Sequence, residues 1–470
     1  MSMTDIAGEK NLWILTEEHP KNEVIEQILM EFAGASGYSA IVNRIRVLPI
    51  LKNGLFSFVY EVTGFNCSKI KHIYIKSVSG YSSFVDFLLF HQDEEPNPKT
   101  DVPSYAIEET KTDDSESRNT GVYQRCSKFV YINKYYPNIR KIMLYNLGIS
   151  QKEEPTETYI FGTRMLMTLG VRIMGKALDD KIFKPFTSID ELIAFKNSMR
   201  RPPAGNVPIE IVKGHNTIFI SGRLVKSDSL SHDPNIGALS IISATLRKLG
   251  WEGRIMITKH GLEQKHLKPG NKFIQIANML HLELEGLEIP IAKNHEDYWY
   301  YDRNGEKLGT IFVHVVVESF TNGYSIYENH AGCERGYFIS SSGEKIAIEK
   351  YSDRDLYKMG DKTKRISIPD LVLLDFDRKE IINIEGKKYE NKQRGIEELE
   401  NYDDIENSYI RKYYPGYRIT RTVVLYGSKE EKIIELEVCF LLNEDGKMIL
   451  GIRAPQLIKD ALERLIDYWR

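Results

Sequence analysis

Residues 366–374 read Ile-Ser-Ile-Pro-Asp-Leu-Val-Leu-Leu, and residues 381–387 read Ile-Ile-Asn-Ile-Glu-Gly-Lys. Asp370 thus lies inside one apolar run, while Glu385 and Lys387 close the next. Because neighbouring strands lie about 4.8 Å apart, an acid on one strand and a glutamate on the next can bind the same divalent ion. Residues i and i+2 of a strand face the same side, so Lys387 accompanies Glu385. The stretch predicts two neighbouring strands that carry a metal site.

The same arrangement occurs a second time in the N-terminal part of the chain. Asp86 lies in an apolar run, and Glu109 and Lys111 close the next apolar run. A polar, helix-like stretch follows each Glu-x-Lys and ends in Lys-Tyr-Tyr-Pro, at residues 134–137 and 412–415. A single Glu-x-Lys arises readily by chance in a chain of this length. The repeated frame with its shared ending indicates a duplicated module.

Composition predicts a globular protein with about two or three domains. The chain has 470 residues, of which 42% are hydrophobic and 27% charged. Its sequence shows neither a signal segment nor an apolar run long enough to span a bilayer, so we expect a cytoplasmic location. The 4 cysteines have no Cys-x-x-Cys spacing. Neither a structural zinc site nor a disulfide framework is therefore predicted. The absence of Gly-x-x-x-x-Gly-Lys-Ser/Thr argues against an ATP-driven translocase.

Hydrophobic periodicity predicts the order helix, several strands, helix, strand in both end regions. The predicted helices are 22–33, 112–134, 236–249, 272–282, 310–320, 393–413 and 456–469. The predicted strands are 45–51, 56–62, 72–76, 84–90, 216–222, 254–258, 345–349, 366–374, 381–385, 419–426 and 434–442. Strands alternate with helices between the end regions, which is typical of an α/β element.

The middle of the chain is basic, although the whole chain has a net charge of −3. Residues 151–280 contain 19 Lys and Arg residues against 12 Asp and Glu residues. A basic segment between acidic flanks indicates a DNA-binding region beside acid-rich metal sites, and a merely solvated basic surface is the alternative. The sequence leaves open which side chains would read base edges. The candidate DNA contacts are Arg200, Arg201, Arg223, Lys226, Arg247, Lys248, Arg254 and Lys259.

The two acid–lysine sets suit phosphodiester hydrolysis. Paired carboxylate oxygens and a backbone carbonyl are hard ligands of the kind that Mg²⁺ prefers, and Mn²⁺ would substitute for it. Such an ion polarises a phosphate and lowers the pKa of a bound water. The lysine would orient or deprotonate that water, or stabilise charge on the phosphorane.

This constellation resembles the PD-(D/E)xK nuclease superfamily and, within it, the type II restriction endonucleases. The resemblance covers residues 13–145 and about 308–445. Pro369 before Asp370 matches the motif literally, whereas the first copy has Val85 at that place. The fold implied is α/β (α+β), with two restriction-endonuclease-like domains that have mixed central sheets and flank an α/β DNA-recognition region. The corresponding domains are 1–148, 149–300 and 301–470.

The resemblance implies two catalytic sites with one metal-binding acid pair each. The first site would consist of Asp86, Glu109 and Lys111, and the second of Asp370, Glu385 and Lys387. Many family members add a glutamate from the first helix of the module. The candidates for this additional acid are Glu26 and Glu318, with Glu23, Glu31 and Glu328 as rivals.

The implied activity is Mg²⁺-dependent, sequence-specific cleavage of double-stranded DNA with one active site per strand. The protein would act as a monomer or homodimer, alongside a cognate DNA methyltransferase. A structure-specific repair or junction nuclease, and a DNA-binding protein with inert nuclease-like domains, are the alternatives.

Three further features receive interpretations from the sequence. Glu108 is predicted to face away from the first site, because it neighbours Glu109 on a strand. Lys128 follows on the predicted helix, where it would contact the DNA backbone or solvent. His330 begins a His-Ala-Gly-Cys-Glu-Arg segment that lacks the spacing of metal ligands. This segment is predicted to be a loop.

Overall fold

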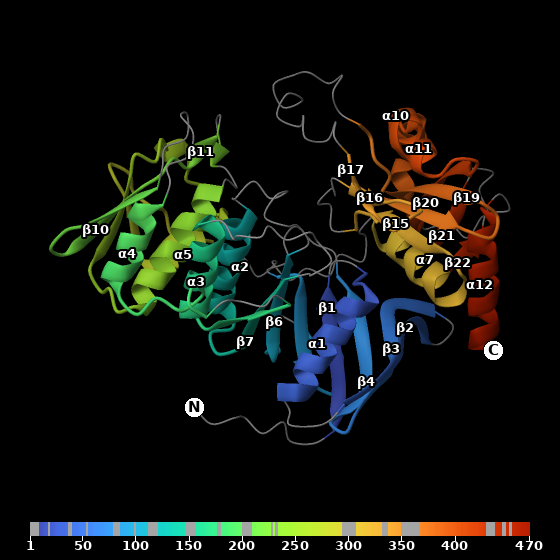
Figure 1. Ribbon diagram of the computed structural model, residues 1–470, viewed down its shortest axis with the longest axis horizontal. Helices are drawn as coiled ribbons and strands as arrows, with labels where there is room; N and C mark the ends of the chain where they lie inside the picture. Colours follow the sequence, from blue (N-terminus) through green and yellow to red (C-terminus); the bar gives the residue numbers. More distant parts are fainter. Residues whose placement is uncertain are drawn as a thin grey trace. The chain divides into compact units, whose positions relative to one another are not determined.

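The computed structural model describes two compact units, and the elements are labelled in Figure 1. Unit 1 comprises Met1–Tyr81, His91–Glu95 and Tyr300–Arg470, and unit 2 comprises Ser82–Phe90 and Pro96–Trp299. These boundaries differ from those of the three predicted domains, which stay a prediction about functional modules. The residues that the structure describes are 9–16, 19–35, 40–52, 55–78, 85–97, 100–110, 121–145, 157–175, 180–199, 209–226, 229–230, 234–293, 307–330, 337–348, 366–428, 438–443, 448–450 and 454–470.

The N-terminal part of unit 1 is a sheet with the strand order β2-β3-β4-β1. Antiparallel pairing joins β2 to β3 and β3 to β4, and β1 runs parallel to β4. Strand β1 was not predicted, and its buried Leu12 and Ile14 lie in the described core. The elements here are β1 (Lys10–Thr16), α1 (Asn22–Ala35), β2 (Ala40–Lys52), β3 (Leu55–Cys67) and β4 (Ile70–Ser77).

The C-terminal part of unit 1 is a mixed sheet with the order β15-β18-β19-β20-β21-β22. Strands β18 and β19 are antiparallel, and β19 and β20 are parallel because helices cross over between them. The helices and outer elements are α7 (Lys307–Phe320), β16 (Tyr337–Ile339), β17 (Lys345–Ala347), α9 (Lys392–Glu400), α10 (Asp403–Ile405), α11 (Arg411–Tyr413) and α12 (Gln456–Trp469). The sheet strands are β15 (Tyr324–Glu328), β18 (Leu371–Asp375), β19 (Glu380–Lys388), β20 (Arg418–Ser428), β21 (Val438–Asn443) and β22 (Met448–Leu450).

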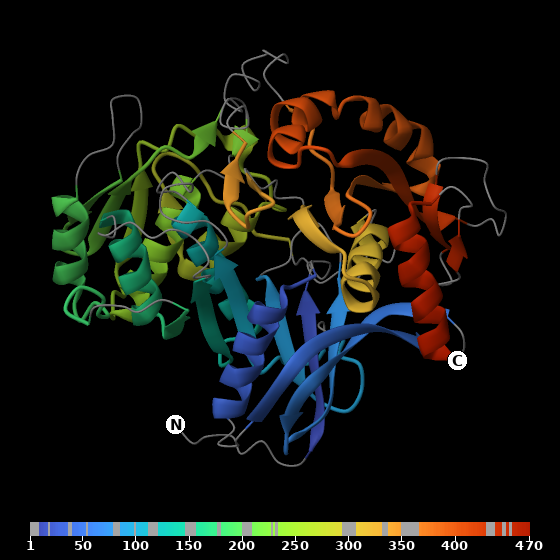
Figure 2. The ribbon, with the colours of Figure 1, turned by 45° about the vertical axis from the view of Figure 1, so that its right-hand side comes forward.

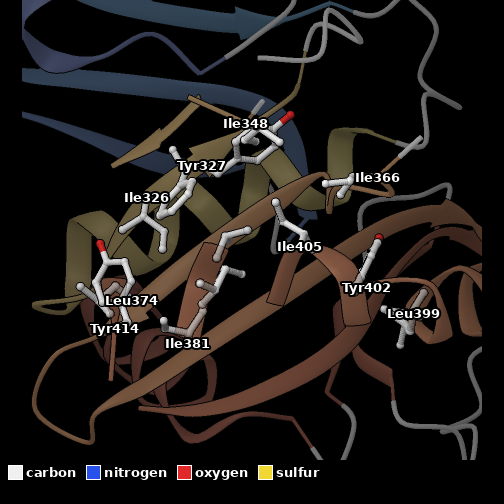
Figure 3. Packing of buried hydrophobic residues seen from close by; sticks show 14 of the residues in the cluster. Ile326, Tyr327, Ile348, Ile366, Leu374, Ile381, Leu399, Tyr402, Ile405 and Tyr414 are labelled. Carbon is white, nitrogen blue, oxygen red and sulfur yellow. The ribbon is translucent and has the colours of Figure 1, made fainter. Parts of the chain in front are cut away.

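Helices cover both faces of this C-terminal sheet. Leu425 of β20 belongs to a buried cluster with Leu399 and Tyr402 of the segment that crosses over between β19 and β20. Figure 3 shows Leu374 and Ile381, two strand members of this cluster, together with Leu399 and Tyr402. Val424, which points to the other face, approaches Gly309 of α7 so closely that a Cβ there would lie 2.9 Å from its Cγ1. Helices α7 and α12 lie side by side (Figure 2).

The crossover segment differs from the continuous helix predicted for residues 393–413. Helix α9 ends at Glu400, and a π-helical turn occupies Glu406–Ile410 before α11. The buried carboxylate of Glu406 accepts hydrogen bonds from Asn383 (2.7 Å) and Arg421 (2.7 Å). Hydrogen bonds to residues on distant strands favour this interruption of the helix. The spacing of apolar residues, on which the prediction rested, does not reveal such bonds. Strand β18 likewise begins after Pro369, which lacks the N–H that a ladder requires.

The described part of unit 2 has two larger sets of paired strands, with helices connecting them. One has the order β5-β6-β7-β8, and the other the order β14-β13-β10-β9. The strands are β5 (Phe87–His91, whose last residue is assigned to unit 1), β6 (Tyr105–Thr110), β7 (Arg140–Tyr145), β8 (Val171–Met174), β9 (Glu210–Lys213), β10 (Thr217–Ser221), β13 (Arg254–Thr258) and β14 (Leu282–Leu284). A small hairpin joins β11 (Val225–Lys226) to β12 (Ser229–Leu230). The helices are α2 (Gly121–Tyr135), α3 (Glu157–Thr168), α4 (Ile189–Ser198), α5 (Pro234–Lys248) and α6 (Lys272–Leu280).

The α/β character predicted for the middle of the chain is confirmed. Strands β10, β13 and β14 are parallel neighbours, and α5 and α6 connect them in sequence. The whole chain is of the mixed α/β class with several mixed sheets, consistent with α+β. Among the helices of the described residues, none has the length and apolar character needed to cross a membrane.

A β-β-α-β arrangement occurs in each unit. In unit 2, β5 and β6 are antiparallel, α2 follows, and β7 runs parallel to β6. In unit 1, β18 and β19 are antiparallel, α9 to α11 follow, and β20 runs parallel to β19. The repeated frame in the sequence therefore corresponds to a repeated arrangement of strands and helices.

Candidate functional site

The two acids of the C-terminal set meet at one end of the β18–β19 pair. Leu371 pairs with Ile384, so Asp370, which directly precedes β18, lies opposite Glu385. The backbone N–H of Gly386 donates to Asp370 Oδ2 at 3.0 Å. Both acids are buried, with exposed fractions of 8% for Asp370 and 5% for Glu385. Antiparallel pairing thus brings together two carboxylates that are 15 residues apart in the sequence.

Lys387 lies on the same face of β19 as Glu385 and contacts its carboxylate directly. Its Nζ is also 2.7 Å from Glu398 Oε2 of α9. Tyr402 donates its hydroxyl hydrogen to the other oxygen of Glu385. Gly395 of α9 allows the close approach, since a Cβ there would lie only 2.9 Å from Lys387 Cγ. Helix α9 therefore supplies a second carboxylate and the space that the lysine needs.

A second lysine contacts the acid pair from α7. Lys307 forms an ion pair with Asp370 Oδ1 and donates to the carbonyl of Asn329 at 2.9 Å. Each carboxylate oxygen of this pair accepts from one donor: Lys307 and the N–H of Gly386 donate to Asp370, and Lys387 and Tyr402 donate to Glu385. Two ammonium groups therefore contact the buried pair.

Burial and neighbouring charge shift the pKa values of this set. Burial, together with the charge of Asp370 and a hydrogen bond to Glu398, raises the pKa of Glu385 to about 8. Burial opposes ionisation of Glu398 as well, but hydrogen bonds with Glu385 and Lys387 lower its pKa to about 2. Burial would also lower the pKa of Lys387, but the carboxylates of Glu385 and Glu398 raise it. Lys387 is therefore an ammonium group at neutral pH.

The chemistry of the C-terminal set fits a hard divalent ion. Asp370 and Glu385 offer carboxylate oxygens from neighbouring strands, and such oxygens are the ligands that Mg²⁺ prefers. The pKa of Glu385 is raised because burial and the nearby charge of Asp370 make its ionised form unfavourable. A divalent cation bound in place of the lysine ammonium groups would favour the ionised form.

The N-terminal set has the same architecture, but a different glutamate faces the aspartate. Phe87 pairs with Ile107, so Asp86 lies opposite Glu108 in the register of β5 and β6. The backbone N–H of Asp86 donates to Glu108 Oε2 at 3.2 Å, and that of Glu109 donates to Asp86 Oδ2 at 2.7 Å. Glu108 thus corresponds to Glu385 by register.

The sequence interpretation of Glu108 as the outward-facing residue was wrong. Neighbouring residues on a strand face opposite sides, and here Glu108 shares the face of Asp86 while the Glu109 side chain points to the other. The residue after Glu108 donates its N–H to Asp86, as Gly386 does to Asp370. The prediction matched Glu109 to Glu385 because both begin a Glu-x-Lys triplet. By strand register, the residue that corresponds to Glu385 is Glu108, one position earlier.

The lysine of the N-terminal set comes from the following helix. Lys128 of α2 places its Nζ 2.6 Å from Glu108 Oε1 and 3.5 Å from Asp86 Oδ1. By register, Thr110 occupies the place that Lys387 has in the other set. The predicted catalytic Lys111 lies outside the described residues. Lys128 was expected to contact the DNA backbone or solvent, and its contacts place it with the acids instead.

The pKa values in the N-terminal set shift in the same directions as in the C-terminal set. Burial and the charge of Asp86 raise the pKa of Glu108 to about 7. Burial would lower the pKa of Lys128, but Asp86 and Glu108 raise it. Burial and the charge of Lys128 lower the pKa of Lys272, on α6, to about 8. This site therefore also holds a carboxylate that protonates near neutral pH.

The additional acids predicted from the first helices are Glu26, which lies on α1, and Glu318, which lies on α7. Glu318 of α7 hydrogen-bonds to His314 at 2.9 Å, and Glu328 lies 3.5 Å from the other nitrogen of that ring. His330 also contacts His314. The sequence analysis missed this histidine cluster, because its members come from separate elements.

The predicted DNA contacts in the middle region fall into different environments. Arg254 forms a bidentate ion pair with Glu283, with distances of 2.9 and 3.1 Å from its Nε. Arg223, Lys248 and Lys259 are exposed. Arg200, Arg201 and the side chain of Lys226 lie outside the described residues. The exposed members remain the candidates for contact with phosphate.

Arg247 has a structural environment. Its guanidinium, in the last turn of α5, donates to the backbone carbonyls of Leu280 (3.1 Å), Trp251 (2.8 Å), Gly253 (2.7 Å) and His281 (3.4 Å). These bonds join α5 to the turn before β13 and to the end of α6. The Arg247 side chain therefore stabilises the packing of α5 and α6 around the second sheet of unit 2.

Replacing Arg247 with alanine is expected to lower the free energy of unfolding by about 2–4 kcal/mol, because partly buried carbonyls lose their donor. The exposed neighbour Lys248 offers the matched control, and Lys248→Ala should change stability by less than about 0.5 kcal/mol. Urea denaturation measures both. If Arg247→Ala leaves stability intact and weakens DNA binding instead, the structural interpretation is wrong.

A scan against protein-family models, a search of curated proteins and a search of solved structures found no match to the chain.

Proposed function

We propose that the protein is a Mg²⁺-dependent endonuclease that cleaves double-stranded DNA, with one active site per strand. The observation that carries the proposal is the repeated convergence of an aspartate, a glutamate and a lysine. Asp370 and Glu385 converge with Lys387 in unit 1, as their contacts show. Asp86 and Glu108 do so with Lys128 in unit 2. Each set lies at the end of an antiparallel strand pair that continues into a helix and a parallel strand.

This arrangement supports restriction-endonuclease-like domains of the PD-(D/E)xK kind. In that family the aspartate precedes or begins one strand and the glutamate and lysine follow on the next. The C-terminal set has this form, and the N-terminal set differs in taking its lysine from α2. The ammonium group still lies beside the acids, so the chemistry of the site is retained although the motif is not.

In the proposed reaction, Asp370 and Glu385 would hold the ion, and Asp86 and Glu108 would hold its counterpart in unit 2. Bound Mg²⁺ supplies Lewis-acid polarisation of the phosphate and a more acidic water. Lys387, held as an ammonium group, donates a hydrogen bond to the phosphate as negative charge builds up on it. Glu398 positions Lys387 through their 2.7 Å contact. A water would lose a proton as its oxygen forms the new bond to phosphorus, the bond to the leaving oxygen would break, and that oxygen would take up a proton.

Plasmid cleavage tests the proposal directly. The full-length protein is incubated with supercoiled plasmids of several sequences in Mg²⁺, Mn²⁺ or Ca²⁺. Discrete linear fragments with Mg²⁺ and Mn²⁺ support a sequence-specific endonuclease, whose cellular partner would be a cognate DNA methyltransferase. Cleavage only at junctions or flaps supports a repair nuclease instead. DNA binding that persists in EDTA, with no cleavage in any of these ions, contradicts the enzymatic proposal.

Proton binding to Glu385 is expected to compete with Mg²⁺ binding. The unfolded chain releases this proton near pH 4.5, whereas the folded chain retains it to about pH 8. The stabilisation of the folded state by this proton is therefore complete below about pH 4.5 and lost as the pH rises to about 8. Over the upper part of this window Mg²⁺ affinity should increase, because the ion binds the ionised carboxylate.

The Mg²⁺ concentration for half-maximal cleavage should accordingly fall about tenfold between pH 6.5 and pH 7.5, and level off above about pH 8. Nicking rates of a Glu108→Gln variant, in which only the C-terminal site remains intact, measure this dependence without interference from the first site. A half-maximal concentration that stays constant from pH 6 to pH 8 would contradict a proton on Glu385.

A further inference from the structure

A buried histidine–glutamate cluster lies in unit 1, on the α7 side of the C-terminal sheet. His314 on α7 is at its centre and is only 2% exposed. Its Nδ1 is 2.8 Å from His330 Nε2 and 3.5 Å from Glu328 Oε2. Glu328 and His330 are 4% exposed each. Three potential metal ligands therefore face one another from a helix and from the end of β15.

The position of Glu318 determines which nitrogen of His314 is available. Glu318 Oε1 lies 2.9 Å from His314 Nε2, and the same oxygen accepts a hydrogen bond from the N–H of Ser325 at 3.0 Å. A carboxylate oxygen accepts the proton of the ring nitrogen that it faces. His314 then carries its proton on Nε2 and presents a free electron pair on Nδ1. Histidine ligands of metals typically have such a carboxylate partner on the distal nitrogen.

The spacing of the three inward atoms suits a zinc-class ion. Zinc bonds to imidazole nitrogen and carboxylate oxygen are about 2.0–2.2 Å long, so tetrahedral ligand atoms lie about 3.3 Å apart. The separations of 2.8 and 3.5 Å from His314 Nδ1 bracket this value. Within the described residues, His314, Glu328 and His330 form a group whose potential ligand atoms all lie within 4.8 Å of one another.

We propose that His314, Glu328 and His330 bind one divalent transition-metal ion of the zinc class, with Glu318 orienting His314. Imidazole together with carboxylate selects zinc-class ions over Mg²⁺, which prefers all-oxygen ligands. This site is distinct from the acid pair of Asp370 and Glu385 and does not depend on the proposed nuclease activity.

The competing explanation is a cluster held together by protons alone. In such a cluster His314 Nδ1 accepts a hydrogen bond from Nε2–H of His330, which lies 2.8 Å away. Glu328 Oε2 lies 3.5 Å from the same unprotonated Nδ1, so two acceptors face each other there. A cation between them would bind both, whereas proton sharing leaves them opposed.

The ion would act on the neighbouring acid site through the backbone between its ligands. Asn329 lies between Glu328 and His330, and its N–H donates to the carbonyl of Asp370 at 2.8 Å. Its carbonyl accepts a hydrogen bond from Lys307 at 2.9 Å. A metal that joins α7 to the end of β15 would therefore fix the residue that contacts both Asp370 and Lys307. Its role would be structural, because its ligands are almost fully buried.

Metal analysis of the full-length protein tests this proposal. Wild type is equilibrated with zinc in excess Mg²⁺, passed through a desalting column and analysed by inductively coupled plasma mass spectrometry. We expect about one zinc ion per chain, and a melting temperature about 5 °C above that of the protein treated with a zinc chelator. His330→Gln and His314→Gln should each lose at least about four fifths of this zinc.

Two control variants separate this site from other zinc binding. His72→Gln removes a half-exposed histidine of unit 1 that pairs with Glu61 at 3.0 Å, and Asp370→Asn alters the acid pair. Both should retain the zinc of wild type. Zinc that is lost in Asp370→Asn but kept in His330→Gln overturns the proposal, and so does wild type that holds less than about a fifth of an ion per chain.

X-ray absorption spectroscopy of zinc-loaded wild type keeps the test decisive if the cluster variants fail to fold. Nitrogen and oxygen ligands with the multiple scattering of imidazole support the proposal. A shell that contains sulfur, or one without imidazole, overturns it.

Discussion

Replacing Glu385 with glutamine is expected to stop plasmid cleavage at the nicked circle. The change removes the charge of a carboxylate that lies opposite Asp370 and contacts Lys387. If each site cuts one strand, the remaining site still nicks the plasmid. Linear product should form on the order of a thousandfold more slowly, because losing a group that holds the charge-stabilising ion removes about 4 kcal/mol of transition-state stabilisation.

The matched control is Glu400→Gln on the exposed end of α9, which removes a glutamate charge from the crossover segment that follows β19. Its linearisation rate should equal that of wild type within about twofold. A Glu385→Gln variant that still linearises plasmid at the wild-type rate excludes the C-terminal set as a catalytic site. A variant that neither nicks nor linearises shows that the N-terminal set is inactive or depends on the other.

In the N-terminal set, replacing Glu108 should have a much larger effect than replacing Glu109. Glu108 faces Asp86 and binds Lys128 at 2.6 Å, whereas the Glu109 side chain points to the other face of β6. Glu108→Gln is therefore expected to arrest cleavage at the nicked circle, with linear product reduced on the order of a thousandfold. Glu109→Gln should lower the rate by less than about tenfold.

Combining variants tests whether the two sites work on separate strands. The double variant Glu108→Gln, Glu385→Gln should leave supercoiled plasmid intact, while each single variant produces nicked circles. End-labelled duplexes then show whether the two single variants cut opposite strands. If Glu109→Gln is inactive and Glu108→Gln is active, Glu109 belongs to the N-terminal site, as the Glu-x-Lys triplet predicted. The strand register would then have selected the wrong glutamate.

Several elements could be predicted because their apolar periodicity is strong and local. The helix from Gln456 to Trp469 and the strand from Arg254 to Thr258 were predicted with the boundaries that the structure has. The C-terminal acids were predicted to lie on neighbouring strands; β18 and β19 are neighbours, with Asp370 directly before the first and Glu385 within the second. Here the strand register follows from the sequence, because a single glutamate is available opposite Asp370.

The N-terminal set could not be predicted correctly, because two adjacent glutamates compete there. The letters Glu109-Thr-Lys111 match the motif, but the pairing of Phe87 with Ile107 selects Glu108. A slip of one residue in a strand exchanges its two faces. The role of Lys128 depends on how α2 packs, and the spacing of residues along the chain carries no information about that.

The histidine cluster escaped detection for a related reason. Its ligands lie on α7 and around β15, and His314 and His330 are separated by 16 positions. Sequence patterns for metal sites rely on short, fixed ligand spacings such as paired cysteines. His330 was interpreted as part of a loop because residues 330–335 alone lack the spacing of metal ligands. Ligands contributed by separate elements become visible only in the folded chain.

Lys307 and Lys387 give the acid pair of unit 1 a further property, which concerns how the protein matures. Two buried carboxylates without counter-charge would make the folded state depend on a metal ion, as in small metal-dependent domains. Here the chain supplies its own exchangeable cations, which contact Asp370 and Glu385 directly. Newly synthesised protein can thus reach its folded state before it acquires an ion. If the proposed function holds, loading would be a replacement of ammonium by metal in a finished structure, and the proposed hydrolytic activity would be withheld until the ion arrives.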